Sequence, residues 1–580
     1  MLKKLSSYLG IYKRYAIYSL FLVGGDVVCE LMMPLLMAQI VDKGIPASDI
    51  GFIARIGGFM VLLALAAIGM GMTNMKYSSE VSQGFGANIR KALFDKVQEF
   101  SFSNIDTFSS ASLITRLTSD VTQLQMTIMM GLRMMLRAPL MLVVAIVLVL
   151  SINARLSLII FAAIPVMVVI ILIVVRIAER LFTNMQQRLD GLNSTIQENL
   201  IGIRVVKAFV REGHEKLKFA RSNDAFMDAA LKAGYLGAAI MPIMMFILNF
   251  STILVIWFGG RMVGAGTMGP GELIAFISYL MQILMSIMMF SMMFLMLARA
   301  KACADRIIEV IDTDVTIKNK PGLDDSGSLP AVTRGKIEFE NVAFRYGIGE
   351  GKNVLSGITF SAEPGEFVAV IGGTGSGKSS LLHLIPRLYD VAEGRVLVDG
   401  VDVRDYRIET LRAGIGMVLQ NNVLFTGTIR ENLLWGDEHA PQEEIEAAVR
   451  DAQADDFIAE SADGYETMLG QGGVNVSGGQ KQRLCIARAL LKKPRILILD
   501  DSTSAVDMAT EARIRDAFRT SRGDTTVLLV SQRISSVKDA DKIIVLDDGR
   551  INGIGTHESL MKTNAIYREI CVSQQEGITE

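Results

Sequence analysis

Six long apolar runs in the first half of the chain restrict its fold more than any other feature of the sequence. They cover residues 16–40, 52–74, 132–152, 156–177, 236–260 and 273–298. A bilayer core of about 30 Å requires roughly 20 apolar residues in a helix. Only helices and closed barrels satisfy every backbone hydrogen bond in lipid. We therefore predict six membrane-spanning helices.

The distribution of basic residues predicts how these helices are oriented. Two long connections, near residues 75–131 and 178–235, carry most of the Lys and Arg side chains of this half, and the short connections carry three: Lys43, Arg155 and Arg261. Basic residues mark the cytoplasmic side of a membrane. We therefore expect the N-terminus and the second half of the chain to be cytoplasmic. The expected location is the cell (plasma or inner) membrane, with multiple passes.

The long connections also show helical spacing of apolar residues, which predicts that the membrane helices extend well into the cytoplasm. The first residues resemble a signal peptide only superficially, because Asp26 and Glu30 interrupt the apolar run and no convincing cleavage site follows. We interpret them as an uncleaved amphipathic stretch followed by the first membrane helix.

Composition divides the chain into three parts. Residues 1–310 form the predicted transmembrane domain, residues 311–334 are polar and rich in Asp, Pro and Gly and predict a linker, and residues 335–580 have the composition of a soluble domain. The net charge is −2 without a basic block, so no nucleic-acid partner is expected. The four cysteines are scattered and match no disulfide framework or metal-ligand spacing.

A glycine-rich motif in the soluble part predicts a phosphate-binding loop. The segment FVAVIGGTGSGKSSLL, residues 367–382, contains G-x-x-x-x-G-K-S between a strand and a helix. In such a loop backbone N–H groups surround phosphate, here with Lys378 on the outer phosphates and Ser379 on Mg²⁺, and the helix N-terminus adds a favourable dipole. The predicted contacts are Gly372, Gly373, Thr374, Gly375, Ser376, Gly377, Lys378, Ser379 and Ser380.

A second apolar strand lies in PRILILDDSTSAVD, residues 494–507, and ends at Asp500. Behind a phosphate loop, this carboxylate is the expected second partner of Mg²⁺. Two further segments lie between the motifs: VLQNNVLFTGTIREN, residues 418–432, and NVSGGQKQRLCIARALL, residues 475–491.

With these segments the full length of the chain resembles the ATP-binding cassette (ABC) family, and specifically its exporter-type half transporters. The resemblance implies a multi-domain fold class: an all-α six-helix transmembrane domain, then an α/β P-loop nucleotide-binding domain with a helical subdomain. It implies an ABC-type transport ATPase that uses ATP and Mg²⁺. It also implies a second half-transporter chain as partner, because two cassettes close around each ATP.

The resemblance also assigns roles to residues outside the phosphate loop. Tyr346 resembles the aromatic residue that stacks on adenine, and Gln420 the glutamine that links Mg²⁺ to the membrane domain. Asp507 resembles an aspartate that acts across the dimer. The signature Ser477, Gly478, Gly479 and Gln480 resembles a second phosphate-binding surface, which faces ATP held by the other subunit.

Three departures from the family pattern are present. Asp501 stands where the family usually has the glutamate base, and Gln532 stands where it has a histidine; a loop at residues 467–475 also lacks the usual Glu-Arg pair. Asp is one methylene shorter than Glu, about 1.5 Å, and a general base needs its carboxylate within about 2.6–3.2 Å of the water. The changes at Asp501 and Gln532 together suggest a degenerate site, as in one subunit of bacterial heterodimeric multidrug-type exporters, whereas the loop bears on how the cassette senses the transmembrane helices.

Other interpretations remain open at the level of sequence: a slow homodimeric exporter, or an ATP-gated channel or regulator. The transported substrate and the partner chain are not identified. Two pairs of charged residues, Asp26 with Glu30 and Arg133 with Arg137, either contact substrate or lie against one another or at a helix end. The seven methionines of residues 279–297 suit either varied apolar substrates or ordinary helix packing.

Overall fold

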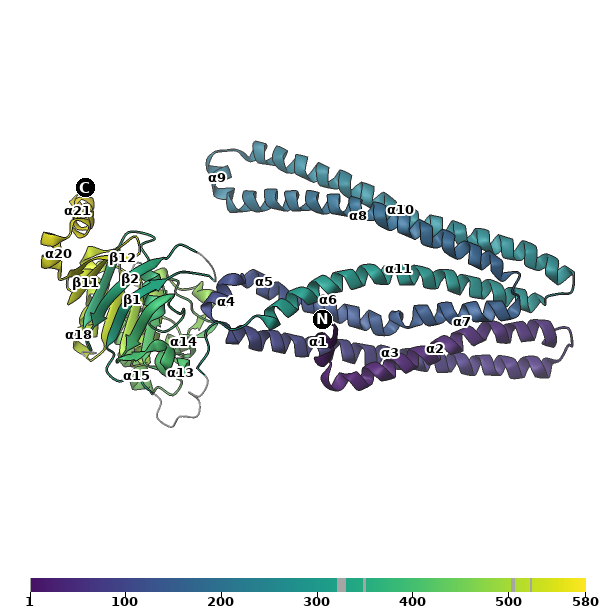
Figure 1. The fold of residues 1–580 in the computed structure, drawn as a ribbon, viewed down its shortest axis with the longest axis horizontal. Helices are drawn as coiled ribbons and strands as arrows, with labels where there is room; N and C mark the ends of the chain where they lie inside the picture. The colour runs from purple at the N-terminus through teal and green to yellow at the C-terminus, as the bar shows by residue number, and fades with distance from the viewer. Residues whose placement is uncertain (1, 321–329, 348–350, 502–505, 522–523, 580) are drawn as a thin grey trace. The chain divides into compact units, whose positions relative to one another are not determined.

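The computed structural model describes residues 2–320, 330–347, 351–501, 506–521 and 524–579 (Figure 1). The chain divides into two compact units: Met1–Val97 with Ala111–Asp312, and Gln98–Ser110 with Thr313–Glu580. The second unit therefore includes a short segment from within the first half of the sequence. Residues 321–329 of the predicted linker lie outside the described residues.

The first unit consists of helices. Their bounds are α1 (Leu2–Ser7), α2 (Lys13–Gln39), α3 (Ile50–Glu99), α5 (Ser110–Thr115), α6 (Val121–Met130), α7 (Arg137–Ile152), α8 (Ser157–Ile201), α9 (Ile203–Ala208), α10 (Glu212–Gly264) and α11 (Pro270–Asp312). Within the described part of the chain, six helical stretches are long and apolar enough to cross a membrane, which confirms the six predicted spans.

Four of these helices are much longer than a bilayer requires. α3, α8, α10 and α11 have 50, 45, 53 and 43 residues, whereas a span needs roughly 20. α8 and α10 pack along each other as a hairpin closed by the short α9 (Figure 1). These helices are thus long enough for the predicted extension of the membrane helices into the cytoplasm. An apolar core shared by α2, α7, α8, α10 and α11 holds the unit together, for example through Val27, Phe276 and Leu280.

The second unit is an α/β structure with two main sheets. A four-stranded antiparallel sheet has the order β2-β1-β4-β5, and a six-stranded sheet has the order β12-β11-β3-β10-β9-β6. The strands are β1 (Ile337–Phe344), β2 (Leu355–Ala362), β3 (Phe367–Gly372), β4 (Glu393–Val398), β5 (Val401–Asp402), β6 (Ile415–Val418), β7 (Gly427–Thr428), β8 (Met468–Leu469), β9 (Ile496–Asp500), β10 (Thr526–Val530), β11 (Lys542–Asp547) and β12 (Arg550–Gly555).

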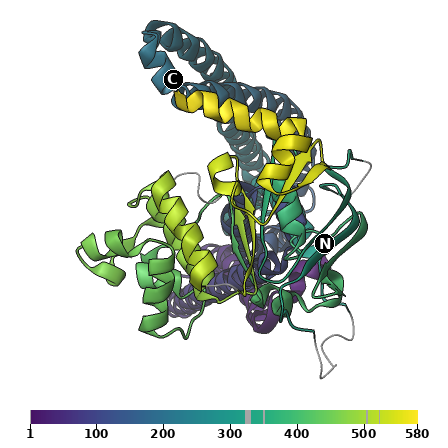
Figure 2. The same ribbon diagram turned by 90° about the vertical axis from the view of Figure 1, so that its left-hand side faces the viewer.

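The five strands from β11 to β6 of the larger sheet pair in parallel, and only β12 at the edge is antiparallel. β3, β9 and β10 are buried at every position, as expected for parallel strands covered on both faces. Figure 2 shows the strands at the centre of the unit with the green helices of residues 430–490 to one side. Parallel pairing brings the carboxyl ends of these strands to one edge of the sheet.

Helices alternate with the strands along most of this unit. They are α4 (Phe102–Thr107), α12 (Lys378–Leu384), α13 (Ile408–Ala413), α14 (Ile429–Leu433), α15 (Gln442–Asp451), α16 (Asp455–Glu460), α17 (Gly478–Leu491), α18 (Met508–Ser521), α19 (Ile534–Val537), α20 (His557–Thr563) and α21 (Ala565–Thr579). Six apolar helices followed by an α/β unit are the fold class that the sequence predicts.

Candidate functional site

The carboxyl edge of the parallel sheet gathers the chemically distinctive residues. β3 ends at Gly372, β9 at Asp500 and β10 at Val530, and these strands are neighbours in the sheet. Ligands of open α/β sheets bind just beyond the carboxyl ends of the strands. The sheet topology therefore joins motifs that are more than 100 residues apart in the sequence.

A cavity of about 350 Å³ lies at this edge. Its lining consists of Tyr346, Val354, Thr374, Gly375, Gly377, Lys378, Ser379, Ser380, Gln420, Asp500, Asp501, Val530 and Gln532. The structure thus brings the phosphate loop, the end of β9, the adenine-stacking candidate and both unusual positions into one site.

The backbone of the phosphate loop requires glycine at two of these positions. Gly375 and Gly377 have φ angles of +82° and +95°, a region that side chains with a Cβ avoid. The Nζ of Lys378 donates to the carbonyl oxygens of Gly372 and Gly373, at 2.9 and 2.7 Å. Burial lowers the pKa of Lys378. The site therefore holds a partly desolvated cation beside exposed loop amides, which suits an anion such as phosphate.

Asp500 and Ser379 form the second part of the site. Asp500 is 2% exposed, and its Oδ1 accepts a 2.9 Å hydrogen bond from the Ser379 hydroxyl. Burial raises the pKa of Asp500, and the Ser379 hydrogen bond opposes this shift. A carboxylate, a hydroxyl and the nearby Gln420 amide are oxygen ligands of the kind that Mg²⁺ accepts alongside water and phosphate.

Tyr346 lies in the same cavity, 45% exposed. Its hydroxyl shares a 2.7 Å hydrogen bond with Ser380, and its ring packs edge-on against Phe344 and Tyr389. Burial raises the pKa of the Tyr346 hydroxyl. The neighbouring rings hold this aromatic side chain at the mouth of the phosphate loop, where a flat base can stack.

The two unusual residues contact each other. The amide Nε2 of Gln532 donates to Oδ2 of Asp501 at 3.3 Å. Asp501 has a φ of +46°, a conformation in which Asp is several-fold enriched among non-glycine residues. Burial, followed by the neighbouring Asp500, raises the pKa of the Asp501 carboxyl. This carboxylate is thus short, bound by an amide and less readily ionised than usual.

The signature residues lie apart from this cavity. Ser477 caps α17: its hydroxyl accepts from the Gln480 N–H at 3.3 Å, and the Gln480 side chain accepts from the Ser477 N–H at 2.9 Å. Ser477 and Gly478 are exposed. Residues 477–480 and Asp507 are absent from the described lining of the cavity.

Asp507 is also exposed, and its Oδ1 accepts from the Thr510 N–H at 2.9 Å. That backbone hydrogen bond lowers the pKa of Asp507. The preceding residues of its motif, 502–505, lie outside the described residues.

One part of the site was not foreseen from the sequence. Residues 98–110 belong to the second unit, where the Tyr389 hydroxyl donates to Asp106 at 2.7 Å and Phe102 packs edge-on against Tyr389. Phe102 also faces His383 of α12, the helix that follows the phosphate loop. The available signal was the cap at Ser101 with an aromatic residue directly after it in SFSNIDTF.

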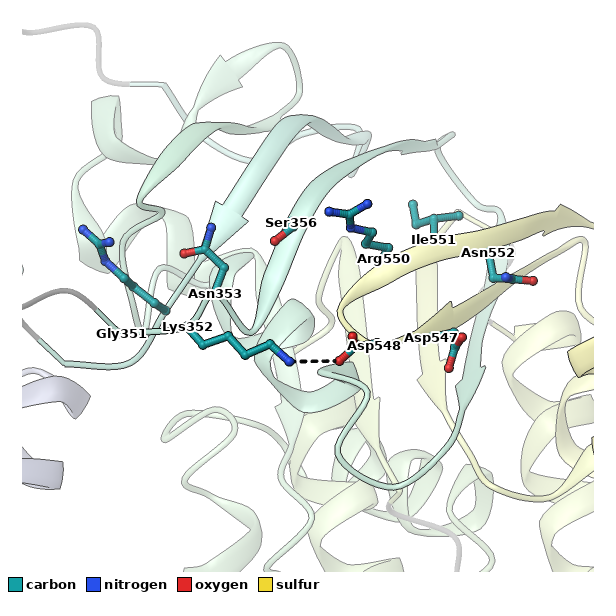
Figure 3. A pocket seen from close by; sticks show the side chains of 10 residues that line it. Gly351, Lys352, Asn353, Ser356, Asp547, Asp548, Arg550, Ile551 and Asn552 are labelled. Atoms are coloured by element: carbon teal, nitrogen blue, oxygen red, sulfur yellow. Dashed lines mark hydrogen bonds and ion pairs between the residues drawn. The ribbon is translucent and has the colours of Figure 1, made fainter.

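A larger hollow of about 760 Å³ lies elsewhere on the same unit, over the turn between β11 and β12 (Figure 3). Lys352 and Asp548 form an ion pair across it at 3.5 Å, and their side chains are 85% and 86% exposed. No residue of the phosphate loop lines it, and its one visible ion pair is highly solvated. Size alone therefore does not mark the functional cavity.

Three of the four charged residues singled out within the apolar runs lie against one another. Arg137 of α7 binds Asp26 at 2.6 Å and Glu30 at 2.5 Å, both on α2. Arg133 donates instead to the hydroxyls of Ser78 and Ser79 on α3, at 2.8 and 3.2 Å. Of the three interpretations that the sequence leaves open, the structure shows mutual pairing for Arg137 with Asp26 and Glu30.

Comparisons with known proteins agree with this geometry. Residues 16–288 match the family described as "ABC transporter transmembrane region", and residues 355–504 match "ABC transporter". The chain is 42% identical to the "Uncharacterized ABC transporter ATP-binding protein YfiB" of Bacillus subtilis (strain 168), over 99% of this chain and 98% of the relative.

Two further proteins are similar over most of the chain. The "Putative multidrug export ATP-binding/permease protein YgaD" of the same organism is 34% identical over 84% of this chain and 83% of its own length. A solved structure titled "Structure of a bacterial Atm1-family ABC exporter with ATP bound" has a TM-score of 0.78 and 25% identity, covering 97% of this chain and 98% of that one.

The matched regions include the apolar helices up to residue 288, the phosphate loop and the end of β9 at Asp500. The chain is a multi-pass membrane protein with an ATP-binding cassette on the same polypeptide. It belongs to the ABC transporter family, as an ATP-driven exporter of the half-transporter type.

Proposed function

We propose that this chain is one half of a two-chain exporter in which it holds Mg-ATP in a degenerate site. Its signature segment completes a second, hydrolytic site whose base and histidine belong to a different polypeptide. The observation that carries this proposal is the contact between the two unusual residues, Gln532 Nε2 to Asp501 Oδ2 at 3.3 Å, inside the cassette cavity.

Binding requires only residues that this chain retains. The loop amides and Lys378 would hold the phosphates, Ser379 and Asp500 would hold Mg²⁺ with Gln420 nearby, and Tyr346 would stack on the base. Bound ATP supplies the phosphoanhydride bond, and Mg²⁺ neutralises charge on its phosphates. These side chains therefore account for nucleotide binding without accounting for rapid hydrolysis.

Hydrolysis requires a base that reaches the attacking water. The Asp501 carboxylate is about 1.5 Å shorter in reach than a glutamate and accepts a hydrogen bond from Gln532. The Gln532 amide is neutral, so it cannot supply the positive charge of a protonated imidazole where charge develops on the phosphate. Positioning and charge stabilisation provide most of the rate in phosphoryl transfer, so we expect slow turnover at this site.

The exposed signature supports the second half of the proposal. Ser477 and Gly478 begin α17 at the surface, with backbone N–H groups at a helix N-terminus that suit phosphate. They lie outside the cavity of their own cassette. A surface of this kind can complete the nucleotide site of another subunit.

We further propose that the cassettes lie in the cytoplasm and the helices in the inner membrane, because basic residues concentrate in the long connections.

A pair of substitutions in the assembled complex tests the division of roles. Asp501→Asn should lower steady-state ATPase activity only modestly, because this carboxylate is already badly placed. Ser477→Arg should nearly abolish it, because a bulky cation blocks the phosphate surface. Thr556→Arg is a matched control, since Thr556 is an exposed cap residue of a different helix, α20; loss of a cap alone costs about 0.5–2 kcal/mol of stability.

Nucleotide trapping should show that the site with Asn at position 501 still holds ATP. Equal, large losses of activity from Asp501→Asn and Ser477→Arg would contradict the proposal. They would mean that Asp501 is the working base and that this site is not degenerate.

A further inference from the structure

A largely apolar cavity of about 730 Å³ lies in the helical unit, remote in sequence from the nucleotide motifs. Its volume is within the range of about 300–1,000 Å³ that is usual for small-molecule sites. Four helical regions form it: α1 with the turn after it, α3, α6 and α11. Its lining is Leu5, Ser6, Leu9, Phe85, Leu124, Thr127, Ile128, Leu297, Ala300, Lys301 and Ala304.

The polar groups of the described lining are two hydroxyls and one cation, without a carboxylate. Ser6 and Thr127 contribute hydroxyls, and Lys301 contributes the cation. Thr127 donates its own proton to the Gln123 carbonyl at 2.8 Å. Among the described residues Lys301 forms no ion pair, and its side chain is exposed at the edge of the cavity. A cation beside apolar walls attracts an anion that carries an apolar body.

The position of the cavity along the helices places it near the membrane surface. On α6, Ile128 and Leu124 precede the predicted span 132–152 by four and eight residues, about 6 and 12 Å at 1.5 Å per residue. On α11, Lys301 comes three residues after the predicted span 273–298. By the proposed orientation this is the cytoplasmic surface, where bilayers carry anionic headgroups.

We propose that this cavity binds an anionic lipid of the cytoplasmic leaflet. The acyl chains occupy the apolar walls formed by Leu5, Phe85 and Leu124, and the headgroup phosphate lies against Lys301. This inference uses the orientation of the helices but does not depend on the degenerate nucleotide site. It predicts lipid binding in the absence of ATP.

Native mass spectrometry of the full-length chain, together with the second chain if one assembles with it, tests the proposal. The protein is presented with phosphatidylglycerol or with phosphatidylcholine that has identical acyl chains. The wild type should retain phosphatidylglycerol preferentially. Lys301→Gln should weaken phosphatidylglycerol binding about fivefold, the usual effect of one basic residue at an anionic surface, and should leave phosphatidylcholine binding unchanged.

Two further variants separate the site from general effects. Thr127→Phe fills the cavity from a partly exposed position, and it should reduce binding of both lipids with Lys301 intact. Lys76→Gln is the matched control, because Lys76 is an exposed lysine on α3 that does not line the cavity. It should bind both lipids as the wild type does, and the melting temperature of each variant confirms that it is folded.

The proposal is overturned if the wild type retains both lipids equally, or if Lys301→Gln and Thr127→Phe bind phosphatidylglycerol as the wild type does. It is also overturned if a second copy of the chain closes the cavity. That result would appear as disulfide cross-links between copies of a Thr127→Cys variant, with no lipid retained.

Discussion

Two side chains at the carboxyl edge of the sheet decide what the nucleotide site can do. Asp501 follows β9 with a positive φ, and Gln532 follows β10 and donates to its carboxylate. Burial and the adjacent Asp500 raise the pKa of Asp501, so a larger share of this carboxyl is protonated near neutral pH than is usual for Asp. A raised pKa does not itself weaken a general base, so the slow turnover we expect rests on the short reach of Asp501 and on the neutral Gln532 amide that binds it.

Restoring the family residues at both positions should create a hydrolytic site. In a preparation of this chain alone, where two copies supply the signature to each other, the double variant Asp501→Glu with Gln532→His should raise the ATPase rate at least tenfold, because a general base alone contributes about 10²–10⁴-fold. Each single variant should give less. A Lys378→Ala change in the double variant is the control, and it should remove the gain; no gain in the double variant would place the defect elsewhere.

Asp500 should lower the stability of the nucleotide-free protein at neutral pH. Its pKa is raised by burial, so the folded chain binds this proton more tightly than the unfolded chain does. The free energy of unfolding therefore falls as the pH rises from the ordinary Asp value, about 3.9, through the raised value. Above the raised pKa, the free energy of unfolding is lowered by the full cost of burying the ionised Asp500 carboxylate.

Asp500→Asn removes this cost and can still accept the Ser379 hydrogen bond. The variant without nucleotide should melt a few degrees higher than the wild type at pH 7, with 1 kcal/mol corresponding to roughly 2–4 °C for a domain of this size. The difference should shrink toward acid pH, and Mg-ATP should no longer stabilise the variant. Scanning fluorimetry across pH measures both effects. A lower melting temperature for the Asp500→Asn variant than for the wild type at pH 7 would show that the buried Asp500 carboxylate does not destabilise the protein.

At the scale of residues, sequence motifs predicted which side chains gather at the cavity but not how they interact. The phosphate loop, Asp500 and Tyr346 are recognisable because each motif has a fixed local spacing. The contact of Gln532 with Asp501 depends instead on the parallel register of β9 and β10, in which Val530 lies beside Asp500. That register is a tertiary property, and no local pattern encodes it.

At the scale of elements, the short helix α4 is the least expected part of the structure. Although it lies between two apolar helices in the sequence, residues 98–110 pack with the α/β unit. The Tyr389 hydroxyl donates to Asp106, and the Asn104 amide donates to the Asp314 carbonyl at 3.0 Å. The six residues of α4 are too few to show helical periodicity, so the sequence gives no signal for this packing. The long apolar helices, in contrast, can be recognised from their composition.

Tyr389→Phe should make the backbone of α4 more mobile. A hydrogen bond to a charged group contributes about 1.5–3 kcal/mol, so its loss should speed backbone amide exchange of residues 101–108 by about tenfold or more, measured by hydrogen–deuterium exchange. Tyr406→Phe is the matched control, because its hydroxyl donates to the Val398 carbonyl within the same unit. Unchanged exchange in the Tyr389 variant would show that this bond does not hold α4.

At the scale of the whole molecule, the chain combines a helical membrane unit with a cassette that binds ATP. The sequence predicted this organisation well, because membrane spans and phosphate loops are set by length, polarity and glycine spacing, all of which are local. The proposed assembly of two chains around ATP depends on surfaces such as the exposed one at Ser477. The residues that would face this surface belong to the other chain, so one sequence cannot identify them.

The most direct test of the central claim is the steady-state ATPase rate of this chain purified alone, compared with the rate after co-expression with its partner chain. The account predicts little or no turnover from the single chain, with ATP still bound, and at least a tenfold higher rate from the complex, as expected when a competent general base is supplied. Robust hydrolysis by the single chain that disappears in a Lys378→Ala variant would contradict it, because the site with Asp501 and Gln532 would then be catalytically complete.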